Sequence, residues 1–272
     1  MIGSSELAQE FWADGKSESC PIYDMHGHMG VWHSIYFPRP DAPDMVGTMD
    51  ECGVRMLVFS HHMALYAPDI ANRSAVDAVR QFPDRLRAYC AVNPNYPEQL
   101  EADLQTFEEH ADVYVGFKFL PDYHKIALTD ERYLPAWEYA NEREMLILTH
   151  TWGHSPFDGP EIVRQVAERY PEVKLLLGHS CHGEWDEAVQ LARDFPNIYL
   201  ELTAIFDDRE ILEKFAAEAG SDRMLFGTDL PWFDPHQAVG ALLSAHISDD
   251  DRHNICHRNA ESLLAPYLND GS

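Results

Sequence analysis

The sequence of 272 residues has few cysteines and no long hydrophobic run. Its five cysteines are scattered and form no C-x-x-C pair, so we expect no disulfide framework. The most apolar stretches, 145–149 and 173–177, are far shorter than the roughly 20 residues that a transmembrane helix needs. Residues 1–14 contain Glu6 and Glu10 and lack the basic-then-apolar order of a signal peptide. These absences predict a cytoplasmic protein.

Basic residues are also scarce. The chain has 20 Lys and Arg against 46 Asp and Glu, which gives a formal net charge of −26. A protein this acidic repels phosphate backbones and anionic lipid headgroups. We therefore expect no nucleic-acid or membrane partner, and we expect a small molecule as the substrate. Because 45% of the residues are hydrophobic, the chain has the composition of a globular protein rather than of a disordered one.

The Gly-rich turn G-x-G-x-x-G is missing after the first apolar run, which argues against a dinucleotide-binding open sheet. Instead, short apolar runs alternate with amphipathic stretches along the whole chain, as in repeated βα units. We predict strands at 21–26, 55–60, 86–92, 113–119, 145–149, 173–178, 198–202 and 224–226. We predict helices at 44–52, 69–82, 97–110, 132–143, 160–170, 185–195, 209–219, 235–246 and 250–264.

Eight βα units in a chain of this length predict an α/β fold, a (β/α)₈ TIM barrel that forms a single domain over residues 1–272. A loop insertion at about 29–43 interrupts the pattern after the first strand. It carries Trp32, Tyr36 and Phe37, and is too aromatic for a simple solvated connector. The loop could cover the mouth of the barrel. Alternatively, it could pack against the outside of the barrel or against the second subunit of a homodimer.

Histidine is the residue type in excess, with 15 copies. Polar residues at the carboxyl ends of barrel strands converge on one mouth. His26 and His28 are two residues apart on the first strand and therefore project the same way. His150 closes the fifth strand, and Asp229 follows the eighth. Three imidazoles and one carboxylate suit one divalent ion, so this set predicts a metal site for Zn²⁺, with Mn²⁺ as the alternative.

These segments resemble the amidohydrolase superfamily, in particular the amidohydrolase-related branch that includes aminocarboxymuconate-semialdehyde decarboxylase. The resemblance implies a metal-dependent TIM barrel, a divalent ion held by His26, His28, His150 and Asp229, and an acid/base role for His179. It extends over nearly the whole chain. The segments that carry it are 23–28 (YDMHGH), 148–150 (LTH), 177–179 (LGH), 226–231 (FGTDLP) and 255–264 (ICHRNAESLL).

Three further residues are candidates for contacts with the substrate. Lys118 lies where binuclear members of the superfamily carry a carboxylated lysine between two metal ions. It could instead contact substrate or extend to the barrel rim, and we expect one metal ion. Glu201 lies in an apolar strand, where a charge is costly unless it is paired; it could orient a ligand, contact substrate or pair with Lys118. Arg39 is the arginine nearest to the predicted mouth.

Hydrolysis of a small carboxylic ester, lactone or amide is the activity that we favour from the sequence. Water activated by the metal would attack, Asp229 would take its proton, and His179 would stabilise the developing oxyanion. The alternative is non-oxidative decarboxylation of a small carboxylic acid, with His179 protonating the carbon that loses CO₂. Decarboxylases of the resembled kind usually need arginine, and Arg39 is the only obvious one. A structural or sensing metal is disfavoured, because structural zinc sites are normally closed by Cys-rich ligands.

Overall fold

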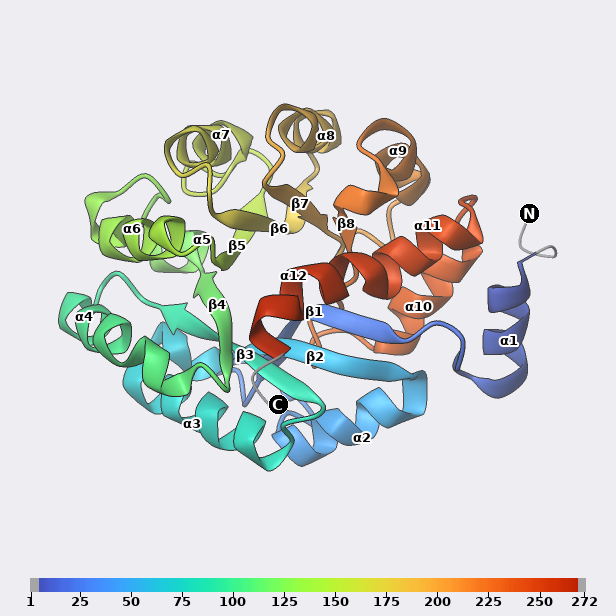
Figure 1. Ribbon diagram of the computed structural model, residues 1–272, viewed down its shortest axis with the longest axis horizontal. Coiled ribbons are helices and arrows are strands. Elements are labelled where there is room, and N and C mark those ends of the chain that lie inside the picture. The colour runs from blue at the N-terminus through green and yellow to red at the C-terminus, as the bar shows by residue number, and fades with distance from the viewer. Residues whose placement is uncertain (1–4, 269–272) are drawn as a thin grey trace.

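The computed structural model describes residues 5–268, and a sheet of eight parallel strands forms its centre (Figure 1). Each strand pairs with the next one along the chain, in the order β1 to β8. The strands are β1 (Ile22–Met29), β2 (Val54–His61), β3 (Leu86–Val92), β4 (Tyr114–Phe119), β5 (Leu146–Trp152), β6 (Lys174–His182), β7 (Ile198–Glu201) and β8 (Met224–Leu225). The predicted TIM barrel is confirmed.

Backbone hydrogen bonds between β1 and the segment after β8 close the barrel. The amide of His28 donates to the carbonyl of Leu230 over 2.6 Å, and the amide of Asp229 donates to the carbonyl of His26 over 2.7 Å. The two candidate ligands of β1 are thereby placed next to the candidate ligand that follows β8. Three of the four candidate ligands therefore meet where β1 and the segment after β8 close the barrel.

Helices surround the barrel (Figure 1). Buried apolar side chains fill the space between the two layers. Helices follow the strands as the alternating pattern predicts. They are α1 (Glu6–Asp14), α2 (Ala42–Cys52), α3 (Pro68–Gln81), α4 (Pro97–Thr106), α5 (Pro121–His124), α6 (Leu134–Glu142), α7 (Pro160–Arg169), α8 (Trp185–Asp194), α9 (Ile211–Glu218), α10 (Pro235–Ser244), α11 (Asp249–His253) and α12 (Asn259–Leu268).

Several features differ from the sequence prediction. The strands β1, β5 and β6 continue three or four residues past their predicted ends, and β2 continues one residue, because the polar residues there remain paired with neighbouring strands although they break the apolar pattern. The predicted helix 250–264 is divided into α11, a π-helical segment at Asn254–Arg258 and α12, and the short helix α5 was not predicted. The helix α1 was not predicted either. It begins after Ser5, whose side chain accepts a hydrogen bond from the amide of Ala8 and so caps the helix.

The end of the barrel at which the strands begin is covered by α12 (Figure 1). Ala260 and Leu264 of this helix pack against side chains inside the barrel, including Met25 and Val58. That end of the barrel is therefore covered, which leaves the opposite end as the expected entrance for a substrate. Among residues 5–268, no helix combines the length and the hydrophobicity that a membrane crossing requires.

Candidate metal centre

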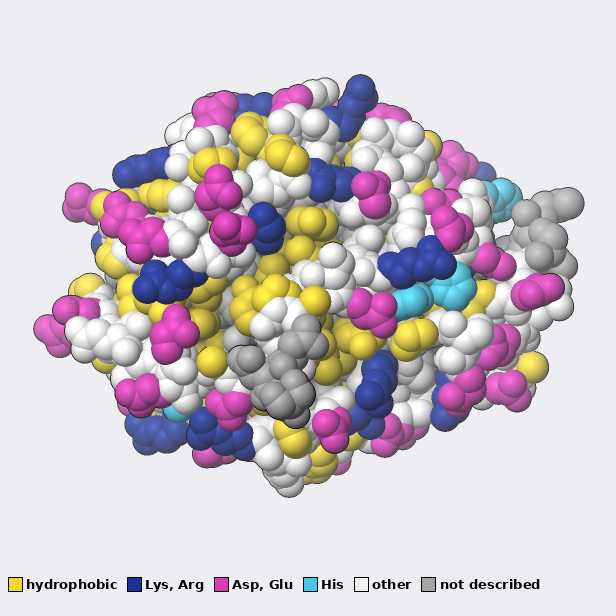
Figure 2. All heavy atoms as spheres, in the orientation of Figure 1, with side chains coloured by type: hydrophobic (Ala, Val, Ile, Leu, Met, Phe, Trp, Pro, Cys, Tyr) yellow, Lys and Arg dark blue, Asp and Glu magenta, His cyan; other side chains and the backbone are white. Residues whose placement is uncertain are grey.

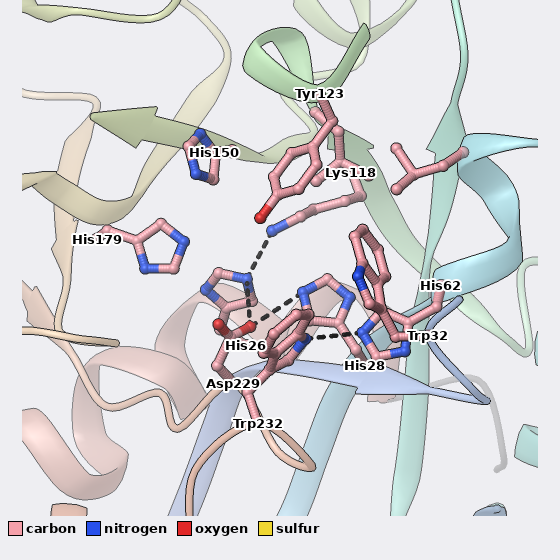
Figure 3. A pocket seen from close by; sticks show the side chains of 12 residues that line it. His26, His28, Trp32, His62, Lys118, Tyr123, His150, His179, Asp229 and Trp232 are labelled. Atoms are coloured by element: carbon pink, nitrogen blue, oxygen red, sulfur yellow. Dashed lines mark hydrogen bonds and ion pairs between the residues drawn. The ribbon is translucent and has the colours of Figure 1, made fainter. Parts of the chain in front are cut away.

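A pocket at the carboxyl ends of the strands contains six of the predicted site residues (Figure 3). It holds a small cavity of about 30 Å³, which has room for a water molecule or an ion as the side chains stand. The predicted residues that line it are His26, His28, Lys118, His150, His179 and Asp229. The other lining residues are Trp32, His62, Leu65, Leu120, Tyr123 and Trp232.

Three of the four predicted ligands form a tight cluster. One ligand atom from each of His26, His28 and Asp229 lies within 4.8 Å of the others. Oδ1 of Asp229 is 3.0 Å from Nε2 of His28 and 3.5 Å from Nε2 of His26. Asp229 has a φ of 61°, a left-handed conformation that is costly for a residue other than glycine. The backbone is thus strained at the point that brings this carboxylate to the histidines.

Hydrogen bonds behind the cluster orient the two histidines. Nδ1 of His26 donates to Oε2 of Glu201 over 2.7 Å, so Nε2 of His26 carries a lone pair toward the pocket. Nδ1 of His28 lies 3.1 Å from Oγ of Ser60. Glu201 is fully buried, and a Cβ atom at Gly227 would overlap its carboxylate. Such outer partners fix the ring orientation of metal-binding histidines.

The cluster has the charge state that a cation needs. Burial lowers the pKa of both His26 and His28, so both rings are neutral at pH 7. Burial alone would raise the pKa of Asp229, but the neighbouring histidines hold it well below its usual range. Oδ1 of Asp229 is buried and has no hydrogen-bond donor of good geometry. Two nitrogen lone pairs and an unsatisfied carboxylate oxygen therefore converge, and this donor set fits a divalent ion.

His150 lies in the same pocket but outside this three-residue cluster. Its ring centroid is 4.9 Å from that of His179. Nδ1 of His150 donates to Oδ2 of the buried Asp158 over 2.7 Å, the same kind of support that His26 receives. The structure therefore shows His150 as an oriented histidine of the pocket, and its place in the ligand set stays a prediction.

His179 is held by its backbone and by its ring. His179, Ser180 and Cys181 all have positive φ angles, of 67°, 46° and 53°. Three such residues in succession mark backbone strain, which clusters at functional sites. Nδ1 of His179 donates to the carbonyl of Thr203 over 3.3 Å, and burial lowers its pKa well below the usual value. In this neutral tautomer Nε2 is free to accept a proton.

Lys118 points into the pocket rather than to the barrel rim (Figure 3). Its Nζ donates to Nε2 of His26 over 2.6 Å, and burial lowers its pKa to about 8 against the opposing effects of Asp229 and Glu201. At pH 7 the side chain is thus mainly charged. Glu201 hydrogen bonds to His26, which agrees with the ligand-orienting role considered for it.

Aromatic side chains form one wall of the pocket and were not predicted as a group. Trp32, Tyr123 and Trp232 surround the histidines, with the Trp32 ring 5.7 Å from that of Tyr123 and 5.3 Å from that of Trp232. Nε1 of Trp232 donates to Nε2 of His62, whose ring stacks on His28. The aromatic composition of the loop at 29–43 was the only sequence signal for this wall.

Glu201 and Arg39 are the two predicted site residues that do not line the pocket. Glu201 lies behind His26, whereas nothing brings Arg39 to the site. Its guanidinium pairs with Glu51 over 3.0 Å, and the side chain is partly exposed. Lys118, a strand residue, is the cation among the side chains that line the pocket. The pocket therefore needs no arginine for a positive charge, because Lys118 of β4 supplies one.

Solved structures share the fold of this chain. An uncharacterized TIM-barrel protein from Bordetella bronchiseptica has a TM-score of 0.75 at 18% identity, covering 91% of this chain and 99% of its own. A 2,6-dihydroxybenzoate decarboxylase complexed with 2,6-dihydroxybenzoate has a TM-score of 0.74 at 16% identity, covering 90% and 99%. The 5-carboxyvanillate decarboxylase of Novosphingobium aromaticivorans, complexed with manganese, has a TM-score of 0.73 at 13% identity, covering 90% and 96%.

A curated relative overturns the expected hydrolase activity. The gamma-resorcylate decarboxylase of a Polaromonas species is 23% identical over 288 residues, covering 80% of this chain and 86% of the relative. Together with the solved decarboxylases, it supports the alternative that we derived from the sequence and not hydrolysis. The sequence model of the amidohydrolase family matches residues 23–265, so the chain belongs to this family of enzymes.

Proposed function

We propose that this chain is a metal-dependent, non-oxidative decarboxylase of a small hydroxylated aromatic carboxylic acid. The observation that carries the proposal is the wall of Trp32, Tyr123 and Trp232 directly beside the cluster of His26 and Asp229. A flat aromatic substrate ring can pack against such side chains, because aromatic pairs favour offset-stacked and edge-to-face contacts. The decarboxylases of gamma-resorcylate and 2,6-dihydroxybenzoate among the relatives support this substrate class.

The residues that would hold the metal are His26, His28 and Asp229, with His150 as the fourth donor. A divalent ion there would supply a Lewis acid for the carboxylate and hydroxyl oxygens of the substrate. The manganese in solved relatives supports Mn²⁺ for this chain, and Zn²⁺ stays a prediction from the sequence. Both ions accept nitrogen and oxygen ligands.

Lys118 binds the substrate carboxylate in this proposal. Its ammonium group lies within the pocket, and the buried surroundings strengthen its attraction to an anion. The charge is needed only while the substrate carries its carboxylate, since CO₂ is neutral. A cation that binds the acid and not the product also favours release of the product.

His179 handles the proton. In the tautomer set by the carbonyl of Thr203, its Nε2 accepts the proton of the substrate hydroxyl group. The ring then returns this proton to the carbon that bears the carboxylate. The bond from carbon to carboxylate breaks, CO₂ leaves, and the product phenolate takes a proton from solvent. The reaction consumes one solvent proton and no oxidant, so a single acid/base group suffices.

The test is turnover of a panel of hydroxybenzoates, esters and lactones by Mn²⁺-loaded protein in D₂O. We expect CO₂ from a hydroxybenzoate, with solvent deuterium on the carbon that lost it. His179→Asn should abolish most of this turnover, whereas the matched variant His154→Asn should not, because His154 lies on the surface and pairs with Glu184. Hydrolysis of an ester or lactone without CO₂ from any acid would refute the proposal.

A further inference from the structure

A second group of metal-binding side chains lies at the other end of the barrel. Cys20 immediately precedes β1, His253 is the last residue of α11, and His257 belongs to the π-helical segment Asn254–Arg258 that follows. One ligand atom of each lies within 4.8 Å of the others. Figure 2 shows histidine side chains gathered on this face, near the position of α11 in Figure 1.

The histidines of this group face each other. Nδ1 of His253 is 3.0 Å from Nε2 of His257. Nδ1 of His257 donates to Oε2 of Glu261 over 3.0 Å, so Nε2 of His257 accepts the hydrogen bond from His253 and carries the lone pair that an ion would take. This is the same arrangement of carboxylate and histidine that supports His26 and His150 in the pocket.

The local backbone also marks this group. The segment Asn254–Arg258 is a π-helix between α11 and α12. Such segments are rare and frequently occur at functional sites. His257 follows His253 by four residues, and the two rings lie side by side with centroids 5.3 Å apart. Both side chains are only half-buried, so an ion can reach them from solvent.

The thiol of Cys20 is buried and contacts a second thiol. Cys256 hydrogen bonds to Cys20, and this contact together with burial raises the pKa of Cys256. Both cysteines are free. The site thus offers one sulfur and two nitrogens. Thiolate and imidazole ligands suit Zn²⁺, whereas Mn²⁺ and Mg²⁺ prefer oxygen.

We propose that Cys20, His253 and His257 form a second metal site, which binds Zn²⁺ and is independent of the metal centre in the pocket. The ion would join the segment before β1 to the helices at the carboxyl end of the chain. These segments are far apart in the sequence, so a bridge between them restricts the unfolded chain strongly. The site therefore stabilises the barrel at the end opposite to the pocket.

Cobalt(II) tests this proposal, because a thiolate bound to Co²⁺ gives a charge-transfer absorption in the near ultraviolet. The ligands of the pocket are nitrogen and oxygen atoms and cannot give this absorption. We expect it when the full-length protein, reduced with a phosphine, is titrated with Co²⁺, and we expect Zn²⁺ to remove it. Cys20→Ser and His257→Gln should each abolish the absorption.

Two variants serve as controls. Cys52→Ser alters another buried cysteine, and His26→Ala removes a ligand of the pocket; both should keep the absorption. His257→Gln changes a half-buried residue, so it tests the site even if Cys20→Ser fails to fold. At a Zn²⁺ concentration a hundredfold above Kd, the unfolding midpoint should rise by about 5–10 °C, and less in His257→Gln.

The proposal is overturned if the reduced protein shows no thiolate absorption with Co²⁺, or if the absorption survives in Cys20→Ser. It is also overturned if thiol titration after reduction and removal of the reductant finds three free thiols instead of five and no metal is bound. That result would show that Cys20 and Cys256 form a disulfide instead.

Discussion

The replacement of Glu201 by glutamine tests the support behind the metal centre. The carboxylate of Glu201 receives four donors: Nδ1 of His26 and the amide of His179 at Oε2, and the amide and hydroxyl of Thr203 at Oε1. Glutamine has almost the same shape but only one acceptor oxygen. Its NH₂ group must therefore face one of the two pairs of donors.

The expected magnitude follows from the contact that is lost. If the NH₂ group faces Oγ1 and N of Thr203, the amide oxygen still accepts from His26, but the negative charge that raises the basicity of that ring is gone. Changes of this kind cost 10- to 100-fold in metal affinity, or about 1.4–2.7 kcal/mol. We expect Glu201→Gln to weaken Mn²⁺ binding by this factor while the overall fold persists.

The assay is competition for Mn²⁺ between the protein and a chelator of known affinity, with circular dichroism as the check on folding. Glu168→Gln is the matched control, since Glu168 is exposed on α7. If Glu201→Gln is folded and binds Mn²⁺ as tightly as the wild type, then the carboxylate does not act through His26, and the role that we assign to it is refuted.

Further predictions concern the other residues of the pocket. His179→Asn should keep Mn²⁺ and lose about 10²- to 10⁴-fold in kcat, and metal loss in this variant would show instead that His179 is a ligand. Because the pKa of Lys118 is about 8, its positive charge opposes a cation at pH 7 and is lost by pH 9. The affinity for Mn²⁺ should therefore rise between pH 7 and pH 9 in the wild type but not in Lys118→Met. Isothermal titration at several pH values would show this difference. Asp158→Asn should weaken Mn²⁺ binding about tenfold by releasing His150, and unchanged affinity would place His150 outside the ligand set. Arg39→Ala should leave kcat/KM within about twofold of the wild type, because surface ion pairs contribute little, and a larger loss in steady-state assays would place Arg39 near substrate.

The fold was predictable because every βα unit repeats the same pattern. Buried parallel strands are short apolar runs, whereas the helices that follow them repeat their apolar residues every three to four positions. The hydrophobic pattern therefore distinguishes strands from helices. The carboxyl ends of the strands were less predictable. His61 and His182 end β2 and β6. A histidine does not continue the apolar signal, although the backbone of each of these residues remains in the sheet.

The cluster of His26, His28 and Asp229 was predictable for a related reason. His26 and His28 share one face of β1 by simple alternation, and Asp229 is brought to them because β8 closes the barrel against β1. The supporting residues were harder to find. Asp158 lies in the loop after β5, where no periodicity fixes its direction, and only the structure shows that it contacts His150.

The type of reaction depends on residues that have no periodic signal. The same histidines and aspartate serve a hydrolase or a decarboxylase, so the ligand set alone leaves the choice open. What distinguishes the two is the chemistry of the facing wall. Trp32 and Trp232 come from the loops after β1 and β8, Tyr123 comes from the short helix α5 after β4, and they meet only when the barrel closes. A count of arginines in the loops misled the sequence argument, because the cation of this pocket, Lys118, comes from inside the strand β4. In this fold, substrate class should therefore be argued from the side chains that face the ligands, including those inside the strands.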